Sequence, residues 1–243
     1  MKILIVSGFL GAGKTTFIKR LARNVDQRFA ILENEYGAAG IDGARLGQNR
    51  QGTQKNVWEM TEQCICCIGK KDFAASVLTI ANVVDPEYLI VEPTGVGSLA
   101  RIIENLRQIE YERIQLLSPV TIVDVYSYRR YMAEYPELYQ DQIRSADTII
   151  VSKTEACQAE EKQRIQKFLQ EINPQAKIIT DYASTMTRED YQSLLLGSRY
   201  EKKVQDTQSG EKMPETFSFE NIRMEAPETL WCFLEQIIRG AFG

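Results

Sequence analysis

The sequence predicts an α/β protein in which helices flank a mostly parallel β-sheet. Two observations indicate this class. Short apolar runs rich in β-branched residues alternate, through about residue 196, with longer segments whose apolar residues recur at helical spacing. The connections between them have ordinary lengths for units in which a helix joins successive parallel strands. The 243 residues suit one large domain, or a domain of about 200 residues with a small appendage.

The predicted elements follow one another in a regular order. The strands are predicted at residues 3–6, 29–32, 57–60, 88–91, 119–123, 148–151 and 177–180. The helices are predicted at residues 15–24, 72–84, 98–108, 138–145 and 159–171. Together these elements define a first domain over residues 1–197.

The C-terminal part of the chain has a different pattern. Residues 198–214 are polar and lack periodicity, which predicts a solvated linker. Beyond it, residues 216–224 alternate like a strand and residues 227–239 have helical spacing. One strand and one helix are too few to fold alone. Residues 215–243 are therefore predicted to be a short β-α appendage on the first domain, or the start of a second.

Composition excludes several classes of function. The net charge is −4, the pI is about 5.2 and no Lys/Arg run resembles a nucleic-acid-binding arm, which argues against binding of nucleic acid. The apolar run before Ser7 is about five residues long, too short for a signal peptide or a membrane span, so we expect a cytoplasmic protein. The chain contains no histidine, so any metal site must use Cys, Asp, Glu, backbone or water.

A glycine-rich segment at residues 8–16 matches the phosphate-binding pattern G-x-x-x-x-G-K-[ST] between a predicted strand and a predicted helix. Backbone N–H groups of such a loop surround the β-phosphate, Lys14 neutralises the β- and γ-phosphate oxygens, and the Thr15 hydroxyl binds Mg²⁺. The motif predicts P-loop nucleotide hydrolase architecture and binding of Mg-GTP or Mg-ATP. The predicted nucleotide-binding residues are Gly11, Ala12, Gly13, Lys14, Thr15 and Thr16.

A second phosphate-side element is predicted where the strand at residues 88–91 runs into Glu92-Pro-Thr-Gly95. Glu92 is expected to bind Mg²⁺ through water, and the Gly95 N–H to meet the γ-phosphate. The alternative is a helix start capped by Thr94 or Ser98. For Asp124, a place near Mg²⁺ and a role that only closes a buried strand are both open.

Ser152-Lys153-Thr154-Glu155 follows a predicted strand at the chain position where the guanine-reading N-K-x-D element would lie. Lys153 can stack its stem on the base, and Glu155 can accept two hydrogen bonds from guanine. Ser152 cannot make every contact of an asparagine. The element favours GTP over ATP, with a Ser-x-x-Glu capping box at a helix start as the alternative.

Three of the five cysteines crowd into Cys64-Ile65-Cys66-Cys67. In an extended segment Cys64 and Cys66 would project to one side, and thiolates select Zn²⁺, Cu(I) or similar ions. Glu33 or Glu35 could add a carboxylate. The alternative is that these are small core residues, which is our interpretation of Cys157 and Cys232.

These motifs together resemble the CobW/HypB/UreG family of P-loop GTPases, most closely its CobW branch. The matching segments are GFLGAGKTT, ENEYG with the following GID, CICC, EPTG and QIRSADTIIVSKTE. The chain departs from the pattern at Ala38, where the family has an acidic residue, and at Gln63, where it has glycine before the first cysteine. Residues 215–243 resemble only the first strand and helix of the branch's C-terminal domain, so that domain is incomplete here.

The resemblance implies a GTPase that couples hydrolysis to delivery of a metal or metallocofactor to a client protein, and that forms a nucleotide-dependent homodimer. Lys14, Thr15, Glu92 and Gly95 are the expected catalytic residues. With no histidine as base, a positioned water attacks and intrinsic hydrolysis is expected to be slow; Asp42 or Glu33 could orient that water. Zn²⁺ or a comparable ion is the expected metal, bound by Cys64, Cys66, Cys67 and Glu33.

Two other functions remain open from the sequence. One is a nucleotide-gated activator of a corrinoid or other cofactor-dependent enzyme, in which the cysteines are structural. The other is an ATP-using small-molecule kinase that shares only the P-loop, against which the element at residues 152–155 argues.

Overall fold

The computed structural model describes residues 1–27, 29–35, 57–63, 70–197, 199–201 and 231. Within residues 33–35, 57–63 and 70–74 it describes the backbone only. The cysteines at positions 64, 66, 67 and 232 lie outside the described residues, as do the predicted strand at 216–224 and nearly all of the predicted helix at 227–239.

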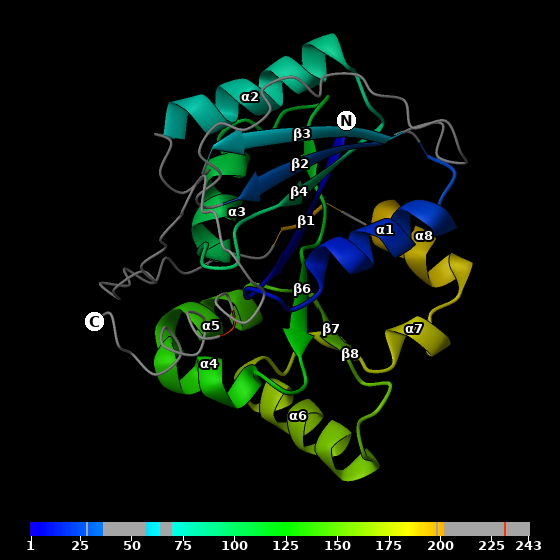
Figure 1. Ribbon diagram of the computed structural model, residues 1–243. Coiled ribbons are helices and arrows are strands. Elements are labelled where there is room, and N and C mark those ends of the chain that lie inside the picture. Colours follow the sequence, from blue (N-terminus) through cyan, green and yellow to red (C-terminus); the bar gives the residue numbers. More distant parts are fainter. Residues whose placement is uncertain (28, 36–56, 64–69, 198, 202–230, 232–243) are drawn as a thin grey trace.

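The described chain contains eight strands, β1 (Lys2–Gly8), β2 (Phe29–Glu35), β3 (Val57–Gln63), β4 (Tyr88–Glu92), β5 (Gln115–Leu116), β6 (Val120–Asp124), β7 (Thr148–Ser152) and β8 (Lys177–Ile179). Seven of them form a sheet in the order β3-β2-β4-β1-β6-β7-β8, and β5 pairs with the start of β1. Every pairing between these strands is parallel. Their carboxyl ends therefore meet at one edge of the sheet (Figure 1).

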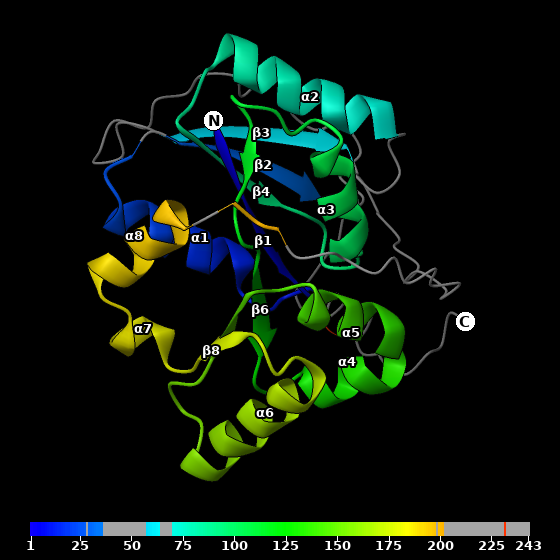
Figure 2. The ribbon, with the colours of Figure 1, turned by 180° about the vertical axis from the view of Figure 1, so that it is seen from behind.

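Its helices are α1 (Lys14–Asn24), α2 (Lys70–Val83), α3 (Leu99–Arg107), α4 (Tyr128–Glu134), α5 (Pro136–Arg144), α6 (Ala159–Ile172), α7 (Tyr182–Thr185) and α8 (Arg188–Leu196). Buried residues of α1, α7 and α8 pack on one face of the sheet. Those of α2 to α6 pack on the other face. Figures 1 and 2 show the two layers from opposite sides. In the described residues no helix is both long and apolar enough to cross a membrane.

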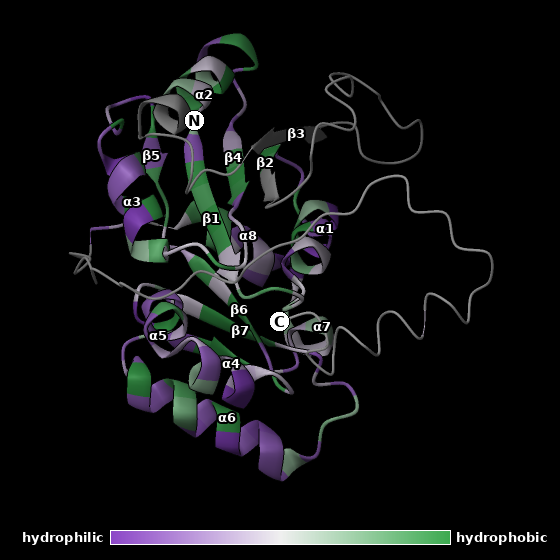
Figure 3. Cartoon of the chain, turned by 60° about the vertical axis from the view of Figure 1, so that its left-hand side comes forward, coloured by the Kyte–Doolittle hydropathy of each residue, from purple (hydrophilic) through white to green (hydrophobic). Residues whose placement is uncertain are grey.

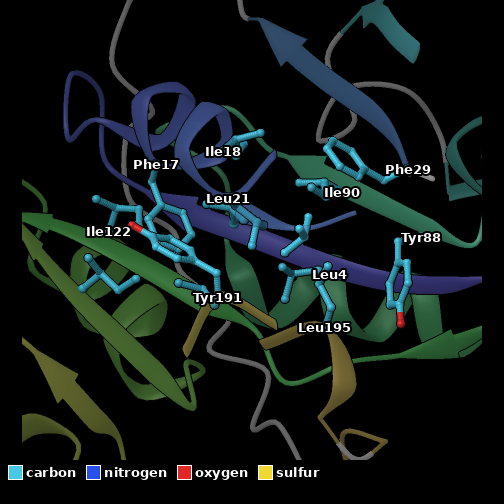
Figure 4. Packing of buried hydrophobic residues seen from close by; sticks show 14 of the residues in the cluster. Leu4, Phe17, Ile18, Leu21, Phe29, Tyr88, Ile90, Ile122, Tyr191 and Leu195 are labelled. Atoms are coloured by element: carbon cyan, nitrogen blue, oxygen red, sulfur yellow. The ribbon is translucent and has the colours of Figure 1, made fainter. Parts of the chain in front are cut away.

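Strand β1 shows why the central strands are continuous apolar runs. Ile3 and Ile5 are fully buried under α3, whereas Leu4 and Val6 are fully buried on the opposite face under α1. Figure 4 shows this second face, with Phe17 of α1 beside Tyr191 of α8. A parallel sheet covered on both sides buries alternate residues on each face, so its strands lack polar alternation. Figure 3 shows the resulting apolar strands between helices with polar outer faces.

The predicted fold class and each predicted strand and helix of the first domain are confirmed within two residues at most boundaries. Four elements were missed: β5, α4, α7 and α8. Helix α4 has the sequence YRRYMAE, whose aromatic and charged residues lack an aliphatic helical period. Helix α8 had a readable signal, because Thr187 and Asp190 form a capping box at its start.

The start of the predicted linker is corrected by the structure. Tyr200 is buried, its backbone N–H donates to the Leu116 carbonyl (2.8 Å) and its hydroxyl donates to the Ser145 carbonyl (3.1 Å). Burial, aided by the charge of Asp147, raises the pKa of Tyr200 to about 12. The packed structure thus extends to Tyr200, because an aromatic side chain here finds a polar partner inside the core. The rest of the linker and the domain division stay predictions.

Candidate functional site

The glycine-rich loop joins the end of β1 to the start of α1, as the motif predicts. Gly8 has φ 143°, and a Cβ placed on it would lie 2.4 Å from the Ile122 carbonyl oxygen of β6. Only glycine adopts this conformation at this distance from a neighbouring strand. Further along, the Ala12 N–H donates to the Phe9 carbonyl (3.1 Å), which closes the loop into a tight turn before α1. The loop therefore has the compact backbone that a phosphate site requires.

Lys14 is buried at the first position of α1. Its ammonium Nζ lies 3.4 Å from the Phe9 carbonyl oxygen of the same loop. Burial lowers the pKa of Lys14, and the nearby negative charge of Glu92 partly opposes that effect. A buried cation with neutral carbonyl contact and one carboxylate nearby is well suited to gain an anionic partner.

Thr15 and Glu92, 77 positions apart, meet between α1 and the end of β4. The Thr15 hydroxyl Oγ1 lies 2.9 Å from Oε1 and 3.2 Å from Oε2 of Glu92. Hydroxyl and carboxylate oxygens are the hard donors that Mg²⁺ prefers, usually together with water and phosphate oxygens. The two residues predicted to bind Mg²⁺ are thus adjacent, and their chemistry fits that ion.

The segment after β4 lies directly against the glycine-rich loop. A Cβ on Gly95 would lie 2.4 Å from the backbone nitrogen and 2.8 Å from the Cα of Leu10. Ser98 caps α3 by accepting a hydrogen bond from the Arg101 N–H (3.3 Å), so the capped helix start considered as an alternative is also present. Capping and contact with the phosphate loop coexist, because the cap begins three residues after Gly95.

The carboxylate of Asp124, at the end of β6, makes hydrogen bonds within the turn that follows the strand. It accepts hydrogen bonds from the Tyr126 N–H (2.8 Å) and the Ser127 hydroxyl (2.9 Å), and pairs with Lys153 Nζ (2.7 Å). These contacts support the strand-closing interpretation of Asp124 over a place beside Mg²⁺.

The predicted base-reading residues follow β7 at the same edge of the sheet. Ser152 donates its hydroxyl proton to the Ala12 carbonyl of the glycine-rich loop (2.6 Å), a role that its sequence position did not reveal. Lys153 has φ 60° and pairs with Asp124, and Glu155 is exposed. The capping-box alternative is wrong, because α6 begins only at Ala159, with Gln158 as its N-cap. Residues 153–158 form a loop instead, in which Lys153 and Glu155 are exposed and Thr154 is buried.

A further contact that the sequence analysis missed supports this loop from the side of β8. Asp181 accepts a hydrogen bond from Lys162 of α6 (2.6 Å) and one from the Thr154 side chain. The bond from Lys162 is the main reason that the pKa of Asp181 is lowered. Asp181 follows β8 as a single acidic residue, and no sequence motif pointed to it.

The predicted transition-metal ligands Cys64, Cys66 and Cys67, and the side chain of Glu33, lie outside what the structure describes. The backbone nevertheless places Glu33 of β2 in register with Glu92 of β4, and Glu35 in register with Gln63 of β3. The residue before Cys64 therefore ends its strand at the edge that holds the phosphate loop. Cys157 is half-buried against an apolar cluster, which supports its interpretation as a packing residue.

Comparisons with known proteins bear on this arrangement. A family model described as "CobW/HypB/UreG, nucleotide-binding domain" matches residues 2–180. The chain is 30% identical over 178 residues to the Zinc chaperone YeiR of Escherichia coli (strain K12), which covers 72% of this chain and 53% of that protein. It is 27% identical over 194 residues to the Zinc chaperone CobW of Pseudomonas aeruginosa, covering 68% and 52% respectively.

Among solved structures, Zn(II)-bound YjiA GTPase from E. coli aligns with a TM-score of 0.60 at 23% identity, covering 87% of this chain and 67% of that one. At this identity the likeness shows a shared fold. The chain spans about half the length of the curated relatives described above.

Proposed function

This chain belongs to the CobW/HypB/UreG family through its nucleotide-binding domain, and from that premise we propose that it is a GTPase metallochaperone. It binds and slowly hydrolyses GTP, and uses the nucleotide state to control delivery of a metal ion or metallocofactor to a client protein. The names of the relatives, two zinc chaperones and a Zn(II)-bound GTPase, support this proposal.

The observation that carries the proposal is the contact between Thr15 and Glu92 at 2.9 Å. It joins the phosphate loop to the end of β4, directly before the segment whose Gly95 packs on Leu10. A site that recognises a terminal phosphate needs its loop and a second strand end within reach of the same phosphate. Here both elements are already in contact through one hydroxyl and one carboxylate.

The chemistry follows from the groups at this edge. Lys14 and the backbone N–H groups of residues 11–15 neutralise charge that spreads over the phosphate oxygens as the bond to the leaving group breaks. Mg²⁺, held by Thr15 and through water by Glu92, would supply positive charge to those oxygens. Since the chain has no histidine, a positioned water attacks without a strong general base, and we expect slow intrinsic turnover.

The nucleotide base is assigned to the loop at residues 152–155. Glu155 is exposed after β7 and free to accept hydrogen bonds from the N1–H and amine of guanine, while Lys153 covers the base with its stem. Adenine has no N1–H to donate, so this carboxylate favours GTP over ATP. Ser152 supports the arrangement by its bond to the Ala12 carbonyl.

The cargo is assigned to the thiolates of Cys64, Cys66 and Cys67, with Glu33 as an added carboxylate and Zn²⁺ as the favoured ion. The backbone register explains how nucleotide and metal can communicate. Glu33 pairs with Glu92, and β3 ends immediately before Cys64 beside β2. A displacement at the end of β4 is therefore passed to β2 and β3 through adjacent parallel strands.

The proposed partners are a client protein that accepts the metal or cofactor and a second copy of this chain in the GTP-bound state. Both follow from the family and stand as proposals. If the cysteines prove structural, the same nucleotide switch serves a nucleotide-gated activator of a cofactor-dependent enzyme instead.

The test is a calorimetric titration of Zn²⁺ into reduced protein loaded in turn with GDP-Mg and a non-hydrolysable GTP analogue. We expect the affinities to differ about tenfold, or about 1.4 kcal/mol of coupling. Cys66→Ala should abolish the difference, whereas Cys157→Ala, which removes a half-buried cysteine from the loop before α6, should leave it intact. Binding of Zn²⁺ to neither form, or equal binding that survives Cys66→Ala, would remove the metallochaperone proposal.

A further inference from the structure

We propose that Gln142 is a positioning residue that sets the backbone conformation of Gly95 and Gly97, and thereby the ability of the site to tell GTP from GDP. The inference rests on the proposed function, because it concerns the residue that fixes the segment at residues 95–97, which is expected to contact the terminal phosphate. Gln142 lies on α5, 47 positions from Gly95, and although it begins the matching segment QIRSADTIIVSKTE, the sequence assigned it no role.

The geometry around the Gln142 side chain is specific. Gln142 is buried on α5, and its amide Nε2 donates to the Gly95 carbonyl (3.1 Å) and to the Gly97 carbonyl (2.9 Å). An amide nitrogen has two hydrogens, so each carbonyl receives one of them. The Oε1 atom is buried without a hydrogen-bond partner among the described residues. The side chain therefore serves this segment as a double donor.

Helix α5 is itself held in place where Gln142 lies. Thr121 of β6 donates its hydroxyl to the Gln142 backbone carbonyl (2.9 Å). The carboxylate of the preceding residue, Asp141, accepts from the Ala100 N–H in the first turn of α3 (3.3 Å). That N–H has no partner within its own helix, since it lies in the first turn. One turn of α5 thus contacts both the segment after β4 and the helix that follows it.

The hydrogen bonds from Gln142 matter for nucleotide binding because Gly95 lies against the phosphate loop. The space between Gly95 and Leu10 of the phosphate loop is too small for a Cβ, so the segment and the loop are in direct backbone contact. A γ-phosphate bound in the loop reaches this segment first. With the carbonyls of Gly95 and Gly97 held by Gln142, the segment has one defined conformation in which to accept that phosphate. Without the two donors, the segment would have to order itself when GTP binds.

A positioning role and a purely structural role of Gln142 predict different effects on nucleotide binding. GDP lacks the γ-phosphate, so its binding depends on the glycine-rich loop and little on the Gly95 segment. A positioning residue for that segment should affect binding of a GTP analogue and hydrolysis, and should spare GDP. A residue needed only for packing should lower all affinities together or lower the melting temperature alone.

The experiment uses the full chain with two substitutions at Gln142 and one control. Gln142→Met keeps the length of the side chain and removes both donors, and Gln142→Glu keeps the shape while placing a carboxylate against two carbonyls. Gln140→Glu is the matched control, because Gln140 lies on the same helix, is half-buried, and within the described part of the chain its side chain has a 3.8 Å contact with the Met132 sulfur and no other hydrogen bond. Circular dichroism and thermal unfolding with GDP verify that each variant is folded.

For each protein the affinities for GDP and for a non-hydrolysable GTP analogue are measured, together with single-turnover GTP hydrolysis. Losing two hydrogen bonds should lower the ratio of analogue to GDP affinity about tenfold in Gln142→Met, and slow hydrolysis by a similar factor. Its affinity for GDP should stay within about threefold of wild type. Gln140→Glu should match wild type in all three measurements.

An unchanged ratio and rate in Gln142→Met overturns the inference, and so does an equal loss of both affinities. If Gln142→Glu fails to fold, Gln142→Met decides alone; if both fail to fold, Gln142 is a packing residue and the inference is overturned. Should wild type itself neither bind nor hydrolyse GTP, the proposed function fails and the inference falls with it. These outcomes are distinct, since the wild-type measurement stands apart from the variants.

Discussion

At the scale of single residues, Lys14 places a buried positive charge in the phosphate loop. Its ammonium is buried against a carbonyl oxygen of the glycine-rich loop, and burial lowers its pKa. A group whose pKa is lower in the folded protein than in the unfolded chain makes the protein less stable while it stays protonated. That cost is full below the lowered pKa and disappears as pH rises from the lowered pKa to the ordinary value of 10.5.

We therefore expect Lys14→Met to be more stable than wild type without nucleotide at neutral pH, by on the order of 1 kcal/mol. The difference should shrink as pH rises, because the wild-type lysine then loses its charge. Denaturant unfolding at a series of pH values measures it, with Lys19→Met, an exposed lysine of the same helix, as control. A variant less stable at neutral pH, or a gap that does not change with pH, would contradict this account.

Position 95 requires glycine because there is no room for a Cβ. A Cβ there would lie 2.4 Å from the Leu10 nitrogen, whereas the nearest atom to a Cβ on Gly97 is the Thr94 carbonyl oxygen at 3.3 Å. We expect Gly95→Ala to lower the free energy of unfolding by about 1–3 kcal/mol, as overpacking does, and to weaken GTP-analogue binding. Gly97→Ala should have a clearly smaller effect on both. Equal effects of the two substitutions, measured by denaturation and by fluorescence titration, would show that contact with Leu10 is not the reason.

At the scale of elements, the loop after β7 is joined to the glycine-rich loop by one hydroxyl. Ser152 is buried and its Oγ lies 2.6 Å from the Ala12 carbonyl oxygen, although the two residues are 140 positions apart. The bond connects the element assigned to the base with the element assigned to the phosphates. An asparagine at this position would have more donors and acceptors than serine. The small serine side chain nevertheless supplies the one donor that links the two loops.

Removing that hydroxyl should loosen nucleotide binding. Ser152→Ala is expected to cost about 1 kcal/mol of stability and to speed dissociation of a fluorescent GDP analogue several-fold, because a buried carbonyl loses its donor. Ser184→Ala removes a comparable hydroxyl bond at an exposed position and should change neither quantity. Stopped-flow displacement gives the rate; unchanged dissociation in Ser152→Ala would mean that the two loops bind nucleotide independently.

The α4–α5 pair is the region that the sequence predicted least well. The predicted helix at residues 138–145 captured α5, but α4 was missed. Tyr131 of α4 donates its hydroxyl to the Leu10 carbonyl (3.0 Å), and Phe9 packs among Tyr131, Tyr135 and Tyr139. Together with Gln142, these residues attach both phosphate-side segments to one pair of helices. Aromatic residues with polar ends gave no helical period to read, yet they are suited to contact a loop backbone.

At the scale of the whole molecule, the parallel sheet gathers the site at one edge. Strands β1, β4, β6 and β7 all end there, and each contributes residues to the glycine-rich loop, the Glu92–Gly95 segment, the Asp124 turn or the base-reading loop. Strands β2 and β3 extend the same edge toward the segment with the cysteines. The backbone of Glu33 and of Gln63, the last residue of β3, therefore lies along the edge that carries the nucleotide elements, and the proposed coupling rests on this register.

The sequence alone determined the α/β class, the strands and helices that alternate along it, and the glycine-rich loop with Lys14 and Thr15. These features are local, because apolar periodicity and glycine spacing are written within about ten to twenty consecutive residues. Only the tertiary structure decided that Glu92 meets Thr15, that Ser152 bonds Ala12 and that Gln142 holds Gly95. Those contacts span 77, 140 and 47 positions, and they depend on the strand order and on which face of the sheet each helix covers, neither of which a local pattern contains.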